Sequence, residues 1–414
     1  MISPLPAISS ALPRLSSPLR LPSGTVLSNR IAKAALSERL GDPDGRPSEA
    51  LLRLWDQWSA SGAGLLLTGN VMVDGRHLGE NGNVYVDERS DVGAFATWAR
   101  RAKAGGSTVW MQINHPGRQA PRMVDRAPVA PSAVAMQIGY GAFARPRPLE
   151  EAEIHAIVAA FGLAASRARE AGFDGVQLHA AHGYLVNQFL SPRTNLRDDA
   201  WGGDAKRRSR FLREVLRAMR AAVGSGFPVG IKLNSADFQR GGFDEGESLD
   251  VVRMVVDEGI DLLEISGGTY ESPEMFREAP KPTGASSTLA REAYFLAYAE
   301  QVRAIVPVPL MVTGGFRTGA GMEAALETGA VDVVGLGRPF CIDPTFPEGL
   351  LAGRLAEVPR PRLETGVKQL DGMVQGGWYL AQLHRMGAGA APDPALSRMR
   401  AVWAYLAAGG PARG

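Results

Sequence analysis

The stretch DGVQLHAAHGYLVNQFLSPRTNLRDDAWGG, residues 174–203, decides both the expected fold and the expected site. Gly175 to Leu178 is a short apolar run, typical of a buried strand. His179, His182 and Tyr184 follow within six residues, in a chain that has only six histidines. In an α/β barrel the carboxyl end of a strand faces the reaction, so this segment is the candidate active site.

Alternating strand and helix patterns extend on both sides of this stretch. We expect strands at 30–36, 64–69, 108–113, 175–178, 227–233, 261–266, 308–313 and 331–336, and helices at 48–61, 91–104, 150–171, 206–223, 248–258, 287–305 and 320–328. An N-terminal β-hairpin over 19–27 precedes them. Eight such units predict an α/β fold of the (β/α)8 TIM barrel type, with a doubly wound sheet as the second choice.

Two regions depart from this alternation. Residues 115–148 are dense in Pro, Gly and Arg, which indicates a long excursion over the barrel mouth. Two amphipathic helices, 367–386 and 394–408, follow the barrel and should pack on it or on a neighbouring subunit through Trp378, Tyr379 and Trp403. We therefore expect one barrel domain over 1–362 and a C-terminal helical extension over 363–414.

The composition restricts the partners. The chain is 45% hydrophobic and 21% charged, and its formal net charge is +2. No basic patch with interleaved aromatics indicates nucleic acid, and no apolar run reaches membrane-spanning length. The single cysteine, Cys341, excludes an intrachain disulfide and a Cys-rich metal or iron–sulfur site. We expect a cytoplasmic protein, as a monomer or homo-oligomer. No acidic residue precedes Glu38, so the N-terminal residues could be either a flexible arm or a presequence.

The ends of the predicted strands carry two kinds of chemistry. The seventh and eighth strands end in Gly314, Gly315, Gly337 and Arg338, where bare backbone and a guanidinium can bind an anion. Barrels commonly hold phosphate at this position, although tight turns also use glycine. Other strand ends carry Ser37, Gln112 and Lys232, which suit an amide-like, electron-rich heterocycle.

Four segments resemble the old yellow enzyme family of FMN-dependent oxidoreductases. They are LSNRIAKAALS (27–37), MQINHPGR (111–118), HAAHGYLVNQFLSPRTNLRDDAWGG (179–203) and VTGGFR…VDVVGLGRP (312–339). The resemblance covers residues 18 to 345. It implies an FMN-binding barrel in which NADH or NADPH reduces the flavin. The flavin then passes hydride to an alkene conjugated to a carbonyl or nitro group.

The resemblance also implies residue roles. His179 and His182 match the pair that hydrogen-bonds the substrate's oxygen while negative charge grows on it. Tyr184 matches the acid that protonates the α-carbon. The implied flavin-binding residues are Ala34, Ala35, Ser37 and Gly69 around the ring, Gln112 at its pyrimidine edge, Lys232 near N1 and O2, and Gly314, Gly315, Gly337 and Arg338 at the phosphate.

Some positions differ from relatives of this family. Ser37 replaces a frequent Thr or Cys, and Lys232 replaces a frequent Arg, so that the charge is kept but bidentate contact is lost. Ala35 replaces a proline, and Arg39 stands where some relatives have a tyrosine, which puts substrate preference in doubt. Tyr140 and Tyr270 do not belong to the positions matched to the family, but they are further candidates for lining the substrate pocket.

Four other functions can be weighed from the residues alone. A metal hydrolase could use His179 and His182, but the strand ends supply no further ligands, and His115 lies just past the third strand in a Pro-Gly turn. We therefore expect no metal. A Schiff-base aldolase could use Lys232. The G-x-G-x-x-A match at 319–324 is a weak dinucleotide-binding signal, and a flavin-binding scaffold without activity leaves Tyr184 without a role.

Overall fold

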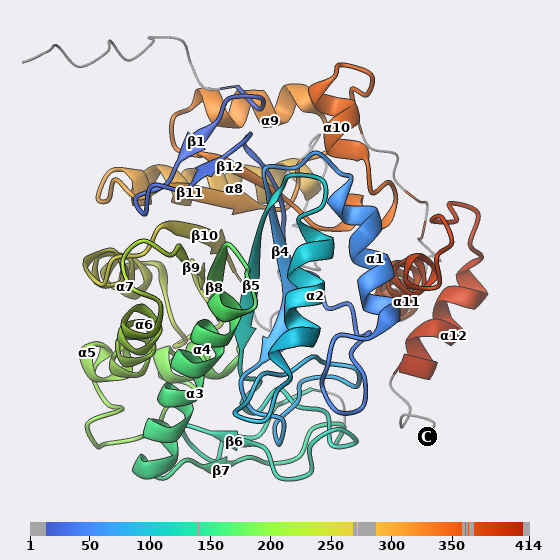
Figure 1. Cartoon of the computed structure of the whole chain (residues 1–414). Helices are drawn as coiled ribbons and strands as arrows, with labels where there is room; N and C mark the ends of the chain where they lie inside the picture. The colour runs from blue at the N-terminus through green and yellow to red at the C-terminus, as the bar shows by residue number, and fades with distance from the viewer. Residues whose placement is uncertain are drawn as a thin grey trace, which may run out of the picture.

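A computed structural model describes residues 14–138, 141–267, 271, 287–357, 361, 363 and 368–408. Eight parallel strands close into a barrel, which confirms the predicted TIM barrel (Figure 1). They are β3 (Ile31–Lys33), β4 (Leu65–Met72), β5 (Thr108–Asn114), β8 (Gly175–Ala180), β9 (Val229–Asn234), β10 (Leu262–Ser266), β11 (Leu310–Thr313) and β12 (Val333–Leu336). Each strand pairs with the next along the chain, and β12 pairs with β3 to close the circle.

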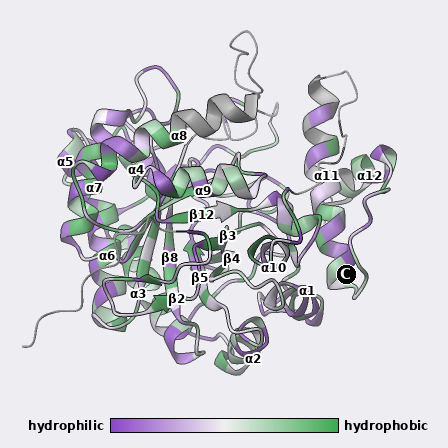
Figure 2. Ribbon diagram, turned by 90° about the horizontal axis from the view of Figure 1, so that it is seen from above, coloured by the Kyte–Doolittle hydropathy of each residue, from purple (hydrophilic) through white to green (hydrophobic). Residues whose placement is uncertain are grey.

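Helices surround the strands, as the view from above shows (Figure 2). They are α1 (Glu49–Ser59), α2 (Val92–Ala102), α3 (Glu151–Glu170), α5 (Ala205–Arg208), α6 (Arg210–Val223), α7 (Glu245–Asp257), α8 (Ser287–Arg303) and α9 (Gly319–Glu327). The continuous helix predicted over 206–223 is wrong. It is divided between α5 and α6 at Ser209, whose Oγ donates a hydrogen bond to the carbonyl of Lys206.

The lower interior of the barrel is filled with apolar side chains. Trp110 on β5 is the largest of them and is fully buried. Gly175 and Gly230 lie on the two strands that follow, and a Cβ at these positions would come within 2.5 Å and 2.7 Å of the Trp110 ring. Glycine is therefore required at both positions, because the indole of Trp110 leaves no space for a Cβ. The polar side chains of the barrel lie further along the strands, toward their carboxyl ends.

Shorter elements complete the barrel. The predicted hairpin is present as β1 (Leu19–Arg20) and β2 (Val26–Leu27), whose leucines belong to the interior cluster. The excursion over 115–148 contains a two-stranded parallel sheet of β6 (Val129–Ala130) and β7 (Arg147–Pro148). The sequence patterns did not predict this sheet, nor α4 (Leu185–Leu190), η1 (Arg338–Cys341) and α10 (Phe346–Leu351).

Two helices at the C-terminal end, α11 (Lys368–Gly387) and α12 (Arg398–Ala408), pack against each other. α11 also contacts α1 and η1, which places it against the barrel. Of the predicted anchors, Trp378 is buried, whereas Trp403 is 67% exposed and so does not anchor α12 on the barrel; its packing on a neighbouring subunit stays a prediction. Among the helices of the described ranges, none has the length and apolar character needed to cross a membrane.

Candidate active site

A chain of four buried polar side chains crosses the barrel interior. Lys232 Nζ lies 2.9 Å from Glu264 Oε1. Gln177 Nε2 donates to Glu264 Oε2 over 2.8 Å, and Gln112 Nε2 donates to Gln177 Oε1 over 2.7 Å. Glu264 and Gln177 have no exposed surface, and the other two are buried. We call Lys232, Glu264, Gln177 and Gln112 the barrel relay.

The relay fixes the orientation of both amides. An ionised carboxylate can only accept hydrogen bonds, so the NH2 group of Gln177 faces Glu264. The oxygen of Gln177 therefore faces the NH2 group of Gln112. Consequently Gln112 retains its oxygen as an acceptor, which suits an N–H group at the edge of a heterocycle.

The relay adds two residues to those predicted. Lys232, predicted as a positive charge beside the heterocycle, is also paired with a buried carboxylate. Glu264 and Gln177 were not predicted because they lie inside their strands, two residues before the end of β10 and three residues before the end of β8. A signal was available, since each is a polar residue with an apolar residue on either side in its strand (LLEIS and GVQLHA).

His182 lies one layer further along the strands. Its φ of +61° is unfavourable for a residue with a side chain. Its N–H donates to Asn234 Oδ1 over 3.1 Å, and its carbonyl accepts from Gln119 Nε2 over 2.9 Å. The Nε2 atom of its ring lies 2.6 Å from Ser266 Oγ. These three contacts hold the strained residue and determine the direction of its ring.

His179 and Tyr184 complete a compact group of rings. The His179 centroid lies 5.0 Å from that of His182 and 4.8 Å from that of Tyr184. Burial, together with the charge of Lys232, lowers the pKa of both histidines well below the ordinary value. Both imidazoles are therefore neutral at pH 7. The Nδ1 atom of His179 accepts the Ala181 N–H over 3.3 Å, so its Nε2 carries the ring proton as a donor.

The turn before α4 positions Tyr184. Tyr184 is the N-cap residue of α4 and is buried. The next residue, Leu185, donates its N–H to the carbonyl of His115 over 3.0 Å. Gln188 of α4 donates from Nε2 to the carbonyls of Pro116 and Gly183. The segment after β5 is thus hydrogen-bonded to the segment that carries Tyr184.

The other predicted ring-binding residues are Ala34, Ala35 and Ser37, which follow β3, and Gly69, which lies inside β4, three residues before its end. Ser37 Oγ donates to Asn70 Oδ1 over 3.2 Å, which leaves the Ser37 oxygen free to accept. Gly69 donates its N–H to Glu38 Oε1 over 2.9 Å, and a Cβ here would meet Glu38 Oε2 at 1.8 Å, so only glycine fits. Ala34 is buried and Ala35 half-buried.

The predicted anion site lies where β11 and β12 end side by side. Gly314 and Gly315 have φ values of +114° and +83°, which favour glycine, and nothing lies within 4 Å of a Cβ placed on Gly314. Gly337 and Arg338 follow β12. Within the described residues the half-buried Arg338 forms no ion pair, and its Cζ lies 5.4 Å from the ring centroid of Tyr379 on α11. Tyr140 and Tyr270 lie outside the described residues.

Comparison with known proteins identifies the family of the chain. Residues 14–357 match the NADH:flavin oxidoreductase / NADH oxidase family. The chain is 38% identical over 357 residues to an NADH-dependent flavin oxidoreductase of Hypocrea jecorina (strain QM6a), covering 81% of this chain and 88% of that protein. An NADPH dehydrogenase of Clostridium acetobutylicum is 31% identical over 324 residues, covering 77% of this chain and 89% of that protein.

Solved structures are similar too. Morphinone reductase superposes with a TM-score of 0.70 at 27% identity, covering 86% of this chain and 93% of that one. The old yellow enzyme homologue from Zymomonas mobilis superposes with a TM-score of 0.69 at 26% identity, covering 84% and 94%. The chain therefore belongs to the NADH:flavin oxidoreductase / NADH oxidase family, the FMN-dependent enzymes related to old yellow enzyme.

Proposed function

We propose that this oxidoreductase is an ene-reductase: NADH or NADPH reduces its FMN, and an alkene conjugated to a carbonyl or nitro group accepts the hydride. The observation that carries the proposal is the group of His179, His182 and Tyr184, with two neutral imidazoles and a phenol in contact at the carboxyl ends of the strands. This group combines donors for a developing oxyanion with an acid for a carbanion.

The residues present fit FMN. Gln112, whose NH2 group is bound to Gln177, would offer its oxygen to an N–H group of the pyrimidine edge, and Lys232 would supply a positive charge near N1 and O2. The small side chains of Ala34 and Ala35 leave room for the ring, with Ser37 and Gly69 beside it. The bare backbone of Gly314, Gly315 and Gly337, with Arg338, is suited to the phosphate. When bound, FMN supplies the hydride chemistry.

The protein's own groups then act on the substrate. His179 donates a hydrogen bond to the substrate's oxygen from Nε2, and His182 donates one from Nδ1 while its Nε2 accepts the Ser266 hydroxyl. Because both rings are neutral, they stabilise charge without adding a full positive charge. Tyr184 donates its hydroxyl proton to the α-carbon, and its position as N-cap of α4 directs the phenol. Hydride addition at the β-carbon and this protonation together saturate the alkene.

Anaerobic spectroscopy of the purified protein tests this function. The protein should show flavin absorbance, which NADH or NADPH should bleach. Addition of a cyclic enone, a nitroalkene or a maleimide should restore the absorbance and yield the saturated product. A colourless protein whose hydrolytic activity is lost with a chelator, or one whose substrate is trapped on Lys232 by borohydride, contradicts the proposal.

Arg338→Gln should weaken FMN binding about 10- to 150-fold, because a hydrogen bond to a charged group contributes about 1.5–3 kcal/mol. The fluorescence of flavin released on dilution measures this affinity. Riboflavin, which lacks the phosphate, is the matched control, and its affinity should stay unchanged. An equal loss for FMN and riboflavin would place Arg338 away from the phosphate.

A further inference from the structure

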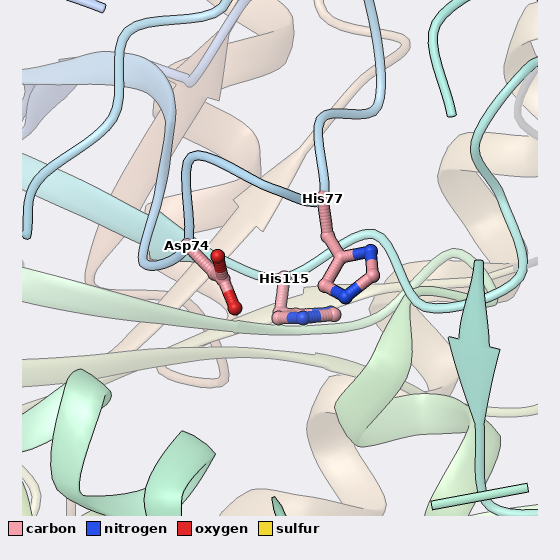
Figure 3. A group of neighbouring side chains, drawn as sticks. All are labelled: Asp74, His77 and His115. Atoms are coloured by element: carbon pink, nitrogen blue, oxygen red, sulfur yellow. The ribbon is translucent and has the colours of Figure 1, made fainter. Parts of the chain in front are cut away.

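Three side chains with metal-binding atoms meet outside the group that acts on the substrate. Asp74 and His77 lie after β4, and His115 directly follows β5 (Figure 3). One ligand atom from each lies within 4.8 Å of the others. Within the described ranges this is the one such trio. Neighbouring strand ends of a barrel thus supply two imidazoles and a carboxylate.

A second carboxylate fixes the orientation of His77. Its Nδ1 atom lies 2.7 Å from Asp125 Oδ2, and both side chains are largely buried. With Nδ1–H donated to Asp125, Nε2 carries the free lone pair. A carboxylate that binds the outer nitrogen of an imidazole is the usual support of a metal-binding histidine.

One ring nitrogen of the buried His115 lacks a hydrogen-bond partner among the described residues. The residue is 1% exposed, and its Nε2 has no hydrogen-bond partner in the part of the chain that the structure describes. A buried polar atom left in this way costs about 1–3 kcal/mol, so a ligand is expected beside it. Because Nδ1 accepts the Gly117 N–H over 3.1 Å, the ring proton lies on Nε2. A metal ion at Nε2 therefore requires this proton to move to Nδ1 and the hydrogen bond with Gly117 to be lost.

The negative charge of Asp74 is balanced by the guanidinium of Arg76, a side chain that can move away into solvent. Its carboxylate accepts from the backbone N–H and the guanidinium of Arg76. The Arg76 side chain is 81% exposed, whereas that of Asp74 is 13% exposed. Because the guanidinium lies in solvent, its attraction to Asp74 is screened and contributes little. A divalent cation on the inner side can therefore take one carboxylate oxygen at small cost.

We infer that Asp74, His77 and His115 form a binding site for a divalent transition-metal ion, with Zn²⁺ as the reference ion and water completing the shell. Two imidazoles with one carboxylate suit Zn²⁺, Fe²⁺ or Ni²⁺ better than Ca²⁺ or Mg²⁺, which prefer oxygen ligands. The site is distinct from the flavin and substrate residues, so no step of the proposed reaction passes through the metal.

Its effect is structural. The ligands join the segment after β4 to the segment after β5, and Asp125 adds the excursion over 115–148. The carbonyl of His115 accepts the N–H of Leu185, the residue after Tyr184. A bound ion should therefore stabilise the segments around Tyr184 and raise the melting temperature of the protein.

Metal binding to the flavin-loaded protein tests the inference. Chelator-treated and dialysed protein is titrated with ZnCl2 in a calorimeter, and bound zinc is measured by elemental analysis after gel filtration. The expected result is one zinc per chain and a higher melting temperature. With CoCl2, visible ligand-field absorption should appear. Failure to retain stoichiometric zinc overturns the inference and leaves the proposed ene-reductase function unaffected.

Variants identify the ligands. His77→Ala and His115→Ala should abolish stoichiometric zinc binding. Asp74→Asn keeps the shape of the side chain and removes its charge, so a loss of zinc binding in this variant cannot be attributed to failure to fold. Asp125→Asn should weaken binding about 10- to 100-fold. His155→Ala, at an exposed position on α3, is the matched control and should bind like the parent. Equal zinc binding by all variants would mean that the zinc binds adventitiously, and it would overturn the assignment of these residues as ligands.

Discussion

Tyr184→Phe is expected to slow alkene reduction by about 10²- to 10⁴-fold, the range that one positioned proton donor contributes, and to leave reduction of the flavin nearly unchanged. The substitution removes one oxygen from a buried ring that lies 4.8 Å from His179. The ring itself remains, so the packing of α4 and the direction of both imidazoles should be kept. Only the source of the proton for the α-carbon is lost.

Anaerobic stopped-flow absorbance separates the two half-reactions. NADH or NADPH reduces the flavin in the first experiment, and a cyclic enone reoxidises it in the second. Ferricyanide is the control oxidant, because it takes electrons without protonation of carbon, and its rate should match that of the parent. If the variant loses its flavin, or if ferricyanide is slowed as much as the enone, Tyr184 has a structural role and not the proposed one.

The residues of this site that could be predicted from the sequence are those that lie next to a recognisable strand pattern. Strands such as 175–178 are apolar runs between helices, and the residue after such a run falls at the barrel mouth. His179, Gly314 and Arg338 could therefore be named from their order along the chain. The similarity to a known family then added the roles, which order alone does not supply.

The remaining features depend on contacts between distant segments. Glu264 and Lys232 are 32 residues apart and meet only because β9 and β10 pair in register. The trio of Asp74, His77 and His115 likewise needs the alignment of β4 and β5. The exposure of Trp403 depends on how α11 and α12 pack, and an amphipathic pattern does not specify which partner covers an aromatic.

The buried Lys232–Glu264 pair should show strong coupling in unfolding experiments. Lys232→Met or Glu264→Gln alone leaves one buried charge without its partner, which costs about 3–5 kcal/mol of unfolding free energy. The double variant carries neither charge and should recover most of that loss. Urea unfolding of the four proteins gives the coupling energy. Arg253→Met, in an exposed pair with Asp250, is the control and should leave the unfolding midpoint unchanged.

The same four proteins test whether the pair tunes the flavin. On the proposed placement, Lys232 lies near N1 and O2, where reduction adds negative charge. Lys232→Met should then lower the flavin midpoint potential, because a stabilising positive charge is lost, and Glu264→Gln should raise it, because an opposing negative charge is lost. The double variant should return close to the parent. If both single variants shift the potential in the same direction, repacking and not charge is the cause, and Lys232 does not face the flavin as proposed.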